Sequence, residues 1–101
     1  MAGSGDGAGV PTAGVLLHER LREQQAAVAA AETAVRAGEP EGVHDLRVAL
    51  RRLRSALATF RPLVDPDVTE PLRDELRWAA GRLGGARDAE VVALRILALL
   101  D

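Results

Sequence analysis

The feature that most constrains the fold is a regular ladder of leucines in the stretch VHDLRVALRRLRSALATF, residues 43–60. Its apolar side chains follow at intervals of four, three, four and three residues: Leu46, Leu50, Leu53, Leu57 and Phe60. At about 100° per residue they fall within a narrow arc of an α-helix, which is the spacing of a seam packed against other helices. We therefore expect a helix over residues 43–60 with this arc buried.

A second helix is expected before the ladder, over residues 15–36, because the segment consists of strong helix formers. Its apolar positions recur at heptad-like intervals: Leu17, Leu21, Val28 and Val35. Ala37-Gly38 ends it well, and Pro40 prevents the helix from continuing. Residues 1–14 are rich in glycine and alanine and are expected to form a flexible tail.

Two more helices are expected after the ladder. Thr69 is a suitable N-cap for a helix over residues 70–83, and Gly84-Gly85 stops it. The last helix is expected over residues 88–100. Four helices, short loops and no strand pattern indicate an all-α four-helix bundle over residues 15–101.

The last expected helix is apolar on several sides: Val91, Val92, Leu94, Ile96, Leu97, Leu99 and Leu100. A helix that is hydrophobic nearly all round needs cover on more than one side. Either another chain or a continuation of this one should therefore pack against it.

The charges are segregated along the chain. The net charge is −2, and all thirteen basic residues are arginine. Residues 44–61 hold five arginines and one aspartate, whereas residues 1–43 hold three arginines and six acids, and residues 62–101 hold five arginines and eight acids. A basic island in an acidic chain indicates a local anionic partner.

The basic residues of the leucine-ladder helix form a stripe of their own. With Leu46 at 0°, four of them fall at roughly 80° to 160°: His44, Arg47, Arg51 and Arg54. Arg61 falls at about 60° by the same count. Arg52 lies on the other side, close to ~240°. The stripe carries no acid at i±4, and a planar guanidinium can donate two hydrogen bonds to one phosphate. Because the stripe repeats every ~5 Å along the axis, it suits an extended polyanion.

An alternative is that these arginines pair with acids of neighbouring helices: Glu19, Glu23, Asp74 and Glu75. His44 alone is typical of a surface or capping residue. Arg73 and Arg77 lie one turn apart and extend the basic surface to the third helix, although Asp74 and Glu75 could neutralise them.

The segment LGGARD places Arg87 at a glycine-rich turn before a helix start, where backbone N–H groups favour anions. The opposing interpretation makes Asp88 an N-cap with Arg87 as its partner. The sequence leaves both interpretations open.

Several functions are disfavoured. The start lacks the regions of a signal peptide, and no run approaches the ~20 apolar residues of a membrane span, so a cytoplasmic location is expected. Two scattered histidines, no cysteine and no acidic pair on the stripe argue against an enzyme, and we expect no cofactor and no metal. Nucleic-acid binding is disfavoured because the chain is acidic and has one Phe and one Trp for stacking.

With VHDLRVALRRLRSAL followed by LRDELRWAAGRLGGARDAEVV, the chain resembles the CHAD domain family, the conserved-histidine α-helical domains, from about residue 15 to the end. The resemblance implies an all-helical module that binds inorganic polyphosphate through a basic groove. Such domains are often located with polyphosphate granules and are frequently fused to a triphosphate-hydrolysing tunnel domain. The residues that the resemblance assigns to the family's motifs are His44, Arg47, Arg51, Arg52, Arg54, Arg77 and the pair Arg87-Asp88.

Members of that family are usually longer, with two similar helical bundles that face each other across the groove, and this chain resembles only the first. An isologous dimer could rebuild the arrangement, or the chain is part of a longer gene product. We expect a non-catalytic polyphosphate-binding module. The alternatives are a helical protein–protein interaction module and an accessory domain of a phosphoanhydride-processing enzyme.

Overall fold

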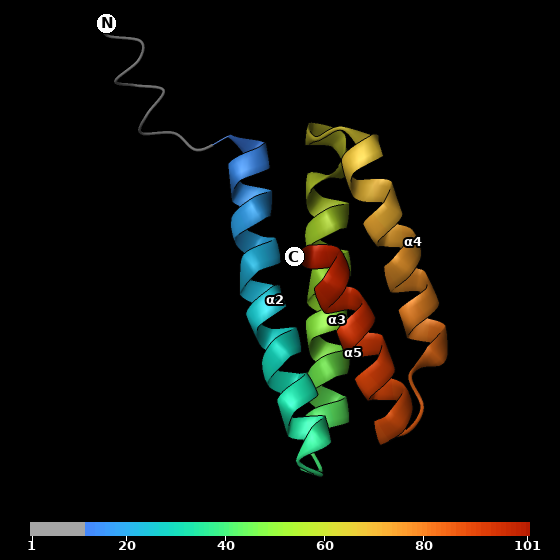
Figure 1. Ribbon diagram of the computed structural model, residues 1–101. Coiled ribbons are helices and arrows are strands. Elements are labelled where there is room, and N and C mark those ends of the chain that lie inside the picture. Colours follow the sequence, from blue (N-terminus) through green and yellow to red (C-terminus); the bar gives the residue numbers. More distant parts are fainter. Residues whose placement is uncertain (1–11) are drawn as a thin grey trace, which may run out of the picture.

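The computed structural model describes residues 12–101, which form four α-helices and no strand. The elements are α2 (Ala13–Arg36), α3 (Gly42–Phe60), the short 3-10 helix η1 (Arg61–Leu63), α4 (Pro66–Arg82) and α5 (Ala86–Leu100). Successive α-helices run in opposite directions (Figure 1). The expected all-α four-helix bundle is confirmed, while most of the expected tail, residues 1–11, lies outside the described residues.

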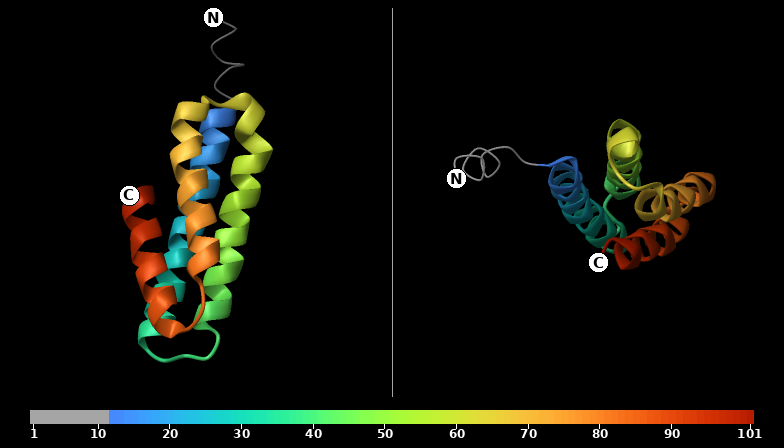
Figure 2. Two further views of the ribbon diagram at one scale, coloured as in Figure 1. Left: turned by 90° about the vertical axis from the view of Figure 1, so that its right-hand side faces the viewer. Right: turned by 90° about the horizontal axis from the view of Figure 1, so that it is seen from above.

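The leucine ladder of α3 forms the middle of an aliphatic core. Leu46, Leu53 and Leu57 are at most 1% exposed, and Phe60 packs against the core from its edge. Each buried leucine contributes about 1.5–3 kcal/mol relative to an exposed one. α2 and α4 each contact α3 and α5, so they occupy opposite positions around the bundle (Figure 2). The predicted seam is confirmed, and it fixes the orientation of the rest of α3.

The turn between α2 and α3 depends on two glycines. Gly38 has a φ of +75°, a conformation that glycine adopts without strain, and its N–H donates to the carbonyl of Val35 at 3.0 Å. A Cβ added at Gly42 would lie 2.8 Å from the backbone nitrogen of Val35. The glycine therefore allows α3 to start in direct contact with α2.

The predicted start of the third helix is wrong. α4 begins at Pro66, where Asp65 is the N-cap and its carboxylate accepts from the Asp67 N–H at 2.9 Å. Thr69 lies inside the helix, is 1% exposed, and its hydroxyl has no hydrogen-bond partner among residues 12–101. Both Asp65-Pro66 and Thr69 carry start signals, and the earlier one prevails because Thr69 faces the core.

α5 begins at Ala86 with Gly85 as its N-cap, two residues before the expected start. Asp88 therefore lies in the first turn, and the interpretation that makes it the N-cap is wrong. α5 is shorter than α2 and ends partway along the bundle (Figures 1 and 2).

Candidate anion-binding groove

The basic stripe of α3 lies exposed beside the buried leucines. Arg47, Arg51 and Arg54 are exposed, while Leu50 and Leu53 between them are buried. Residues three and four apart share a helix face, so one helix presents both rows at intervals of about 5 Å. The core thus holds the stripe in place on a regular element.

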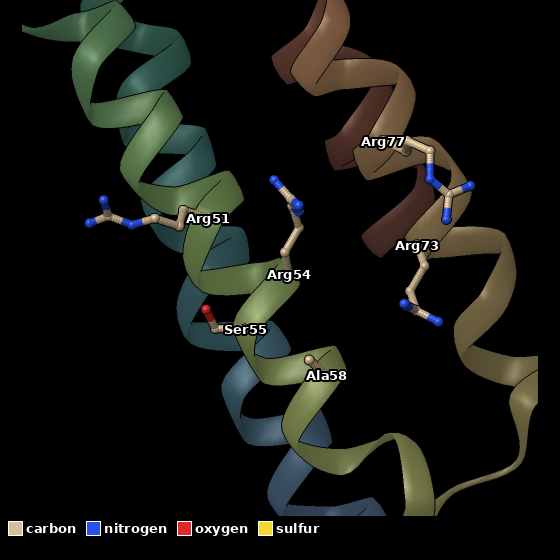
Figure 3. Close-up of a pocket in the computed structure, with 6 residues that line it drawn as sticks. All are labelled: Arg51, Arg54, Ser55, Ala58, Arg73 and Arg77. Atoms are coloured by element: carbon tan, nitrogen blue, oxygen red, sulfur yellow. The ribbon is translucent and has the colours of Figure 1, made fainter.

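α4 completes a groove with this stripe. A depression of about 380 Å³ opens between the two helices, lined by Arg51, Arg54, Ser55, Ala58, Arg73 and Arg77 (Figure 3). A second depression of about 340 Å³ shares Arg51 and Arg54 and adds Arg47. We define the α3–α4 groove by the five arginines that line these depressions: Arg47, Arg51, Arg54, Arg73 and Arg77.

Figure 3 shows how these side chains lie. Arg54 projects from α3 toward the space beside α4, whereas Arg51 extends along the other side of α3. Ser55 and Ala58 follow them by four residues and line the groove with small side chains. The sequence analysis missed Ser55 and Ala58, and the available signal was a small residue one turn after each arginine.

The two walls of the groove differ in their ion pairs. On α4, Arg73 donates to Glu70 at 2.8 Å and Arg77 donates to Asp74 at 3.0 Å, both within the helix. On α3, no carboxylate of residues 12–101 forms an ion pair with Arg47, Arg51 or Arg54, whereas Arg61, directly after the helix, lies 4.0 Å from Glu70 of α4. The α3 wall therefore presents unpaired cations, and the α4 wall presents paired ones.

The alternative in which acids of neighbouring helices neutralise the stripe does not describe this structure. Glu23 lies 3.8 Å from Arg20 of its own helix, and Glu75 binds Arg95 of α5. Glu19 forms no ion pair within the described part of the chain. None of these acids forms an ion pair with a residue of α3 among residues 12–101.

The pKa of Glu70 is shifted by the positive charges around the groove. The hydrogen bond from Arg73 lowers the pKa of Glu70 below its ordinary value of 4.5, although partial desolvation opposes the shift. The charges of Arg73, Arg61 and Arg77 lower it further. Glu70 is therefore ionised at neutral pH.

The other three expected site residues lie outside the groove. His44 is exposed one turn before Arg47, in neither depression. Arg52 lies on the opposite side of α3, at depressions that α2 also lines. Arg87 lies in the first turn of α5, beside residues of α2. The structure brings five of the eight expected residues together.

The opposite flank of α4 carries a cluster that the sequence analysis missed. Arg95 of α5 donates to both oxygens of Glu75, at 2.7 and 2.9 Å, and its guanidinium stands 4.2 Å from the centroid of the Trp78 ring. The hydrogen bond from Arg95 lowers the pKa of Glu75, against the effect of burial. The cluster ties α4 to α5, and the signal was the three-residue spacing of Glu75 and Trp78.

The chemistry of the groove is that of anion binding. Its charged lining consists of guanidinium groups, which stay protonated near neutral pH and only donate hydrogen bonds. In residues 12–101 no group of three or more His, Asp or Glu side chains is placed to hold a metal ion. None of the described helices has both the length and the apolar character that a membrane span requires.

Comparison with known proteins points to one family. The chain matches the family model described as CHAD domain over residues 19–101. It is similar to two proteins of Mycobacterium tuberculosis, uncharacterized protein MT2285 (strain CDC 1551 / Oshkosh) and uncharacterized protein Rv2226 (strain ATCC 25618 / H37Rv). Each is 36% identical over 85 residues, which cover 84% of this chain and only 17% of the relative. No solved structure matches the chain.

Proposed function

Because the chain belongs to the CHAD domain family, we propose that it binds inorganic polyphosphate through the α3–α4 groove and catalyses no reaction. The family is known for polyphosphate binding in general. The observation that supports this groove as the site is that Arg47, Arg51 and Arg54 have no carboxylate partner within residues 12–101.

The shape of the groove suits a linear polyanion. Arg47 and Arg54 are seven residues apart on one helix, a separation of about 10 Å, which is longer than a single phosphate. Each guanidinium can donate two parallel hydrogen bonds to phosphate oxygens. Like charges this close repel one another, and a chain of phosphates between α3 and α4 would remove that repulsion.

The non-catalytic part of the proposal is supported by the charged side chains that line the two depressions, which are all arginines. Arginine can stabilise charge in a phosphoryl transfer, so what its chemistry excludes is acid–base catalysis. A guanidinium neither accepts nor releases a proton near neutral pH, so it cannot act as a general acid or base. A domain that only holds polyphosphate would work in the cytoplasm at polyphosphate granules or beside a phosphoanhydride-processing enzyme. Both settings require the same property, which is polyphosphate binding without catalysis.

Calorimetry with polyphosphate of defined length tests the site. The variant Arg47→Ala/Arg51→Ala/Arg54→Ala should lose about 100-fold or more in affinity, because each charge-assisted hydrogen bond contributes about 1.5–3 kcal/mol. The matched control is Arg20→Ala/Arg22→Ala/Arg82→Ala, which removes three charges outside the groove. Equal losses in both variants would show that only net charge matters and would refute the site.

Two further measurements separate polyphosphate from other polyanions. Affinity for polyphosphate should fall linearly with salt on a double-logarithmic plot, because counterions are released from each neutralised phosphate. DNA or RNA of equal charge should compete poorly, since a single Trp and a single Phe leave few rings for stacking bases. Stronger competition by nucleic acid than by polyphosphate would reverse the assignment.

The outer face of α5 supports a second function, self-association. One stripe of this helix has the spacing of a helix–helix seam: Arg87, Val91, Leu94, Ala98 and Asp101. Val91 and Leu94, at its centre, are 56% and 52% exposed. In an antiparallel pair of α5 helices centred on Leu94, Arg87 of one copy would lie near Asp101 of the other, because both are seven residues from Leu94. We propose that this face binds a second copy of the chain.

Sedimentation velocity over a range of concentrations tests self-association. The parent should dimerise, and Leu94→Asp should be monomeric, because it buries a charge in the proposed contact. Leu63→Asp is the matched control, since Leu63 is also an exposed leucine but lies in η1. A parent protein that stays monomeric at high concentration would refute the proposal.

A further inference from the structure

Two carboxylates compete for the arginines of the α4 wall. Glu70 and Asp74 each precede their arginine by three residues and bind it at 2.8 and 3.0 Å. Glu70 also lies 4.0 Å from Arg61, so it faces two cations. The unpaired and paired walls of one groove are therefore not equivalent toward a phosphate.

A phosphate that binds Arg73 or Arg77 must displace the carboxylate or lie beside it. Both outcomes reduce the binding free energy that this arginine contributes, because the carboxylate lies on the same helix three residues away. Glu70 cannot step aside by protonation near neutral pH, because a carboxyl is ionised there and Arg73 lowers the pKa of Glu70 further below 4.5. The competition is thus a permanent property of the α4 wall.

We propose that Glu70 and Asp74 limit the affinity of the groove for polyphosphate and the number of phosphates that it neutralises. This inference rests on the proposed function. In the parent protein the three α3 arginines carry most of the binding, and Arg73 and Arg77 remain largely occupied by their own carboxylates.

The two pairs should not contribute equally. Arg77 and Asp74 have side chains 72% and 67% exposed, so water and salt screen this pair strongly. Arg73 and Glu70 are 26% and 40% exposed, and Glu70 has Arg61 as a second neighbour. Glu70 is therefore the stronger competitor.

The test compares Glu70→Gln, Asp74→Gln and the double variant with the parent, by calorimetry with long-chain polyphosphate at several salt concentrations. The double variant should bind about 3- to 30-fold more tightly, and Glu70→Gln should give most of the gain. The salt dependence should become steeper by about 0.7 for each arginine that is released, the slope per contact of a single-stranded polyanion. Glu19→Gln/Glu41→Gln is the control, because it removes two exposed acids outside the groove.

These measurements separate competition from a purely structural role. If a carboxylate only orients its arginine, the glutamine variant should bind polyphosphate more weakly and its salt dependence should not become steeper. Unchanged or weaker binding by the double variant, or a gain no larger than that of the control, overturns the inference while the parent still binds. A parent that binds no polyphosphate overturns the proposed function and this inference with it.

Discussion

The arginines on the two flanks of α4 pair differently: the ion pair on the α5 flank joins two helices, and those on the groove flank lie within α4. On the flank toward α5, Arg95 meets Glu75 of another helix and stacks over Trp78. On the flank toward α3, Arg54 projects toward the space beside Arg73 and Arg77, and Arg73 and Arg77 pair only with carboxylates of α4 itself among the described residues. The same residue type fastens the bundle on one flank and leaves an open basic groove on the other. Arginine content alone therefore says little about function, and the placement of the acids decides it.

The largest effect is expected at the residue that separates the flanks. Leu76 is 1% exposed, and Leu76→Ala should lower the free energy of unfolding by about 2–5 kcal/mol, because it removes buried methyl groups and leaves a cavity. Urea denaturation monitored by circular dichroism measures the loss. Arg77→Ala, at the next position but exposed, should keep the parent's midpoint. Similar losses in both would mean that the leucine face does not hold α4.

A carboxylate placed on α3 would give the α3 wall of the groove an ion pair, as Glu75 does for Arg95 on the α5 flank of α4. Ala58 follows Arg54 by four residues, so Ala58→Glu can form an i,i+4 ion pair with it. We expect polyphosphate to bind about tenfold more weakly in calorimetry at low salt, because one phosphate contact is lost and a negative charge is added. Ala58→Gln has nearly the same shape without the charge and should bind within about twofold of the parent. If both variants bind equally, unpaired arginine on α3 is not what polyphosphate requires.

Between α4 and α5, acid should remove the stabilisation that the ion pair of Glu75 with Arg95 provides. The pKa of Glu75 is lowered from 4.5 in the folded protein, so its carboxylate stabilises the fold above that value. This contribution is lost as the pH falls from about 4.5 through the lowered pKa. Glu75→Gln should therefore have a lower urea midpoint than the parent at neutral pH and should approach the parent in acid, with unchanged polyphosphate affinity. A constant difference between the two proteins across the acid range would contradict the pairing.

The fold was largely predictable because the strongest signal is local. The spacing from Leu46 to Phe60 defines the buried face of α3 without knowledge of any partner. The start of α4 was not predictable, since Asp65 and Thr69 both have the chemistry of an N-cap, and only the core shows that Thr69 is buried. A local pattern fixes a helix, while competition between two similar signals is settled by packing.

The groove was predictable in part for the same reason. A helical wheel places Arg47, Arg51 and Arg54 beside the seam, but it does not say which helix lies next to them. That α4 supplies the second wall, and that Glu75 turns to Arg95 instead of the groove, depends on how the helices are arranged. Spacing alone did not show that Arg52 and Arg87, which the resemblance assigned to the site, lie outside the groove.

Arg52 and Arg87 provide the smallest expected effect and the sharpest test of that distinction. The sequence resemblance assigned both to motifs of the family, but Arg52 faces α2 and Arg87 lies beside α2 at the start of α5. Changing both to alanine should therefore alter polyphosphate affinity by less than about twofold at physiological salt, where charges more than ~8 Å from the ligand are screened. Arg51→Ala/Arg54→Ala removes the same number of charges within the groove and should weaken binding by at least about tenfold. A loss of that size in the Arg52→Ala/Arg87→Ala variant, measured by the same calorimetry, would mean that polyphosphate extends around α3 and is not confined to the groove with α4.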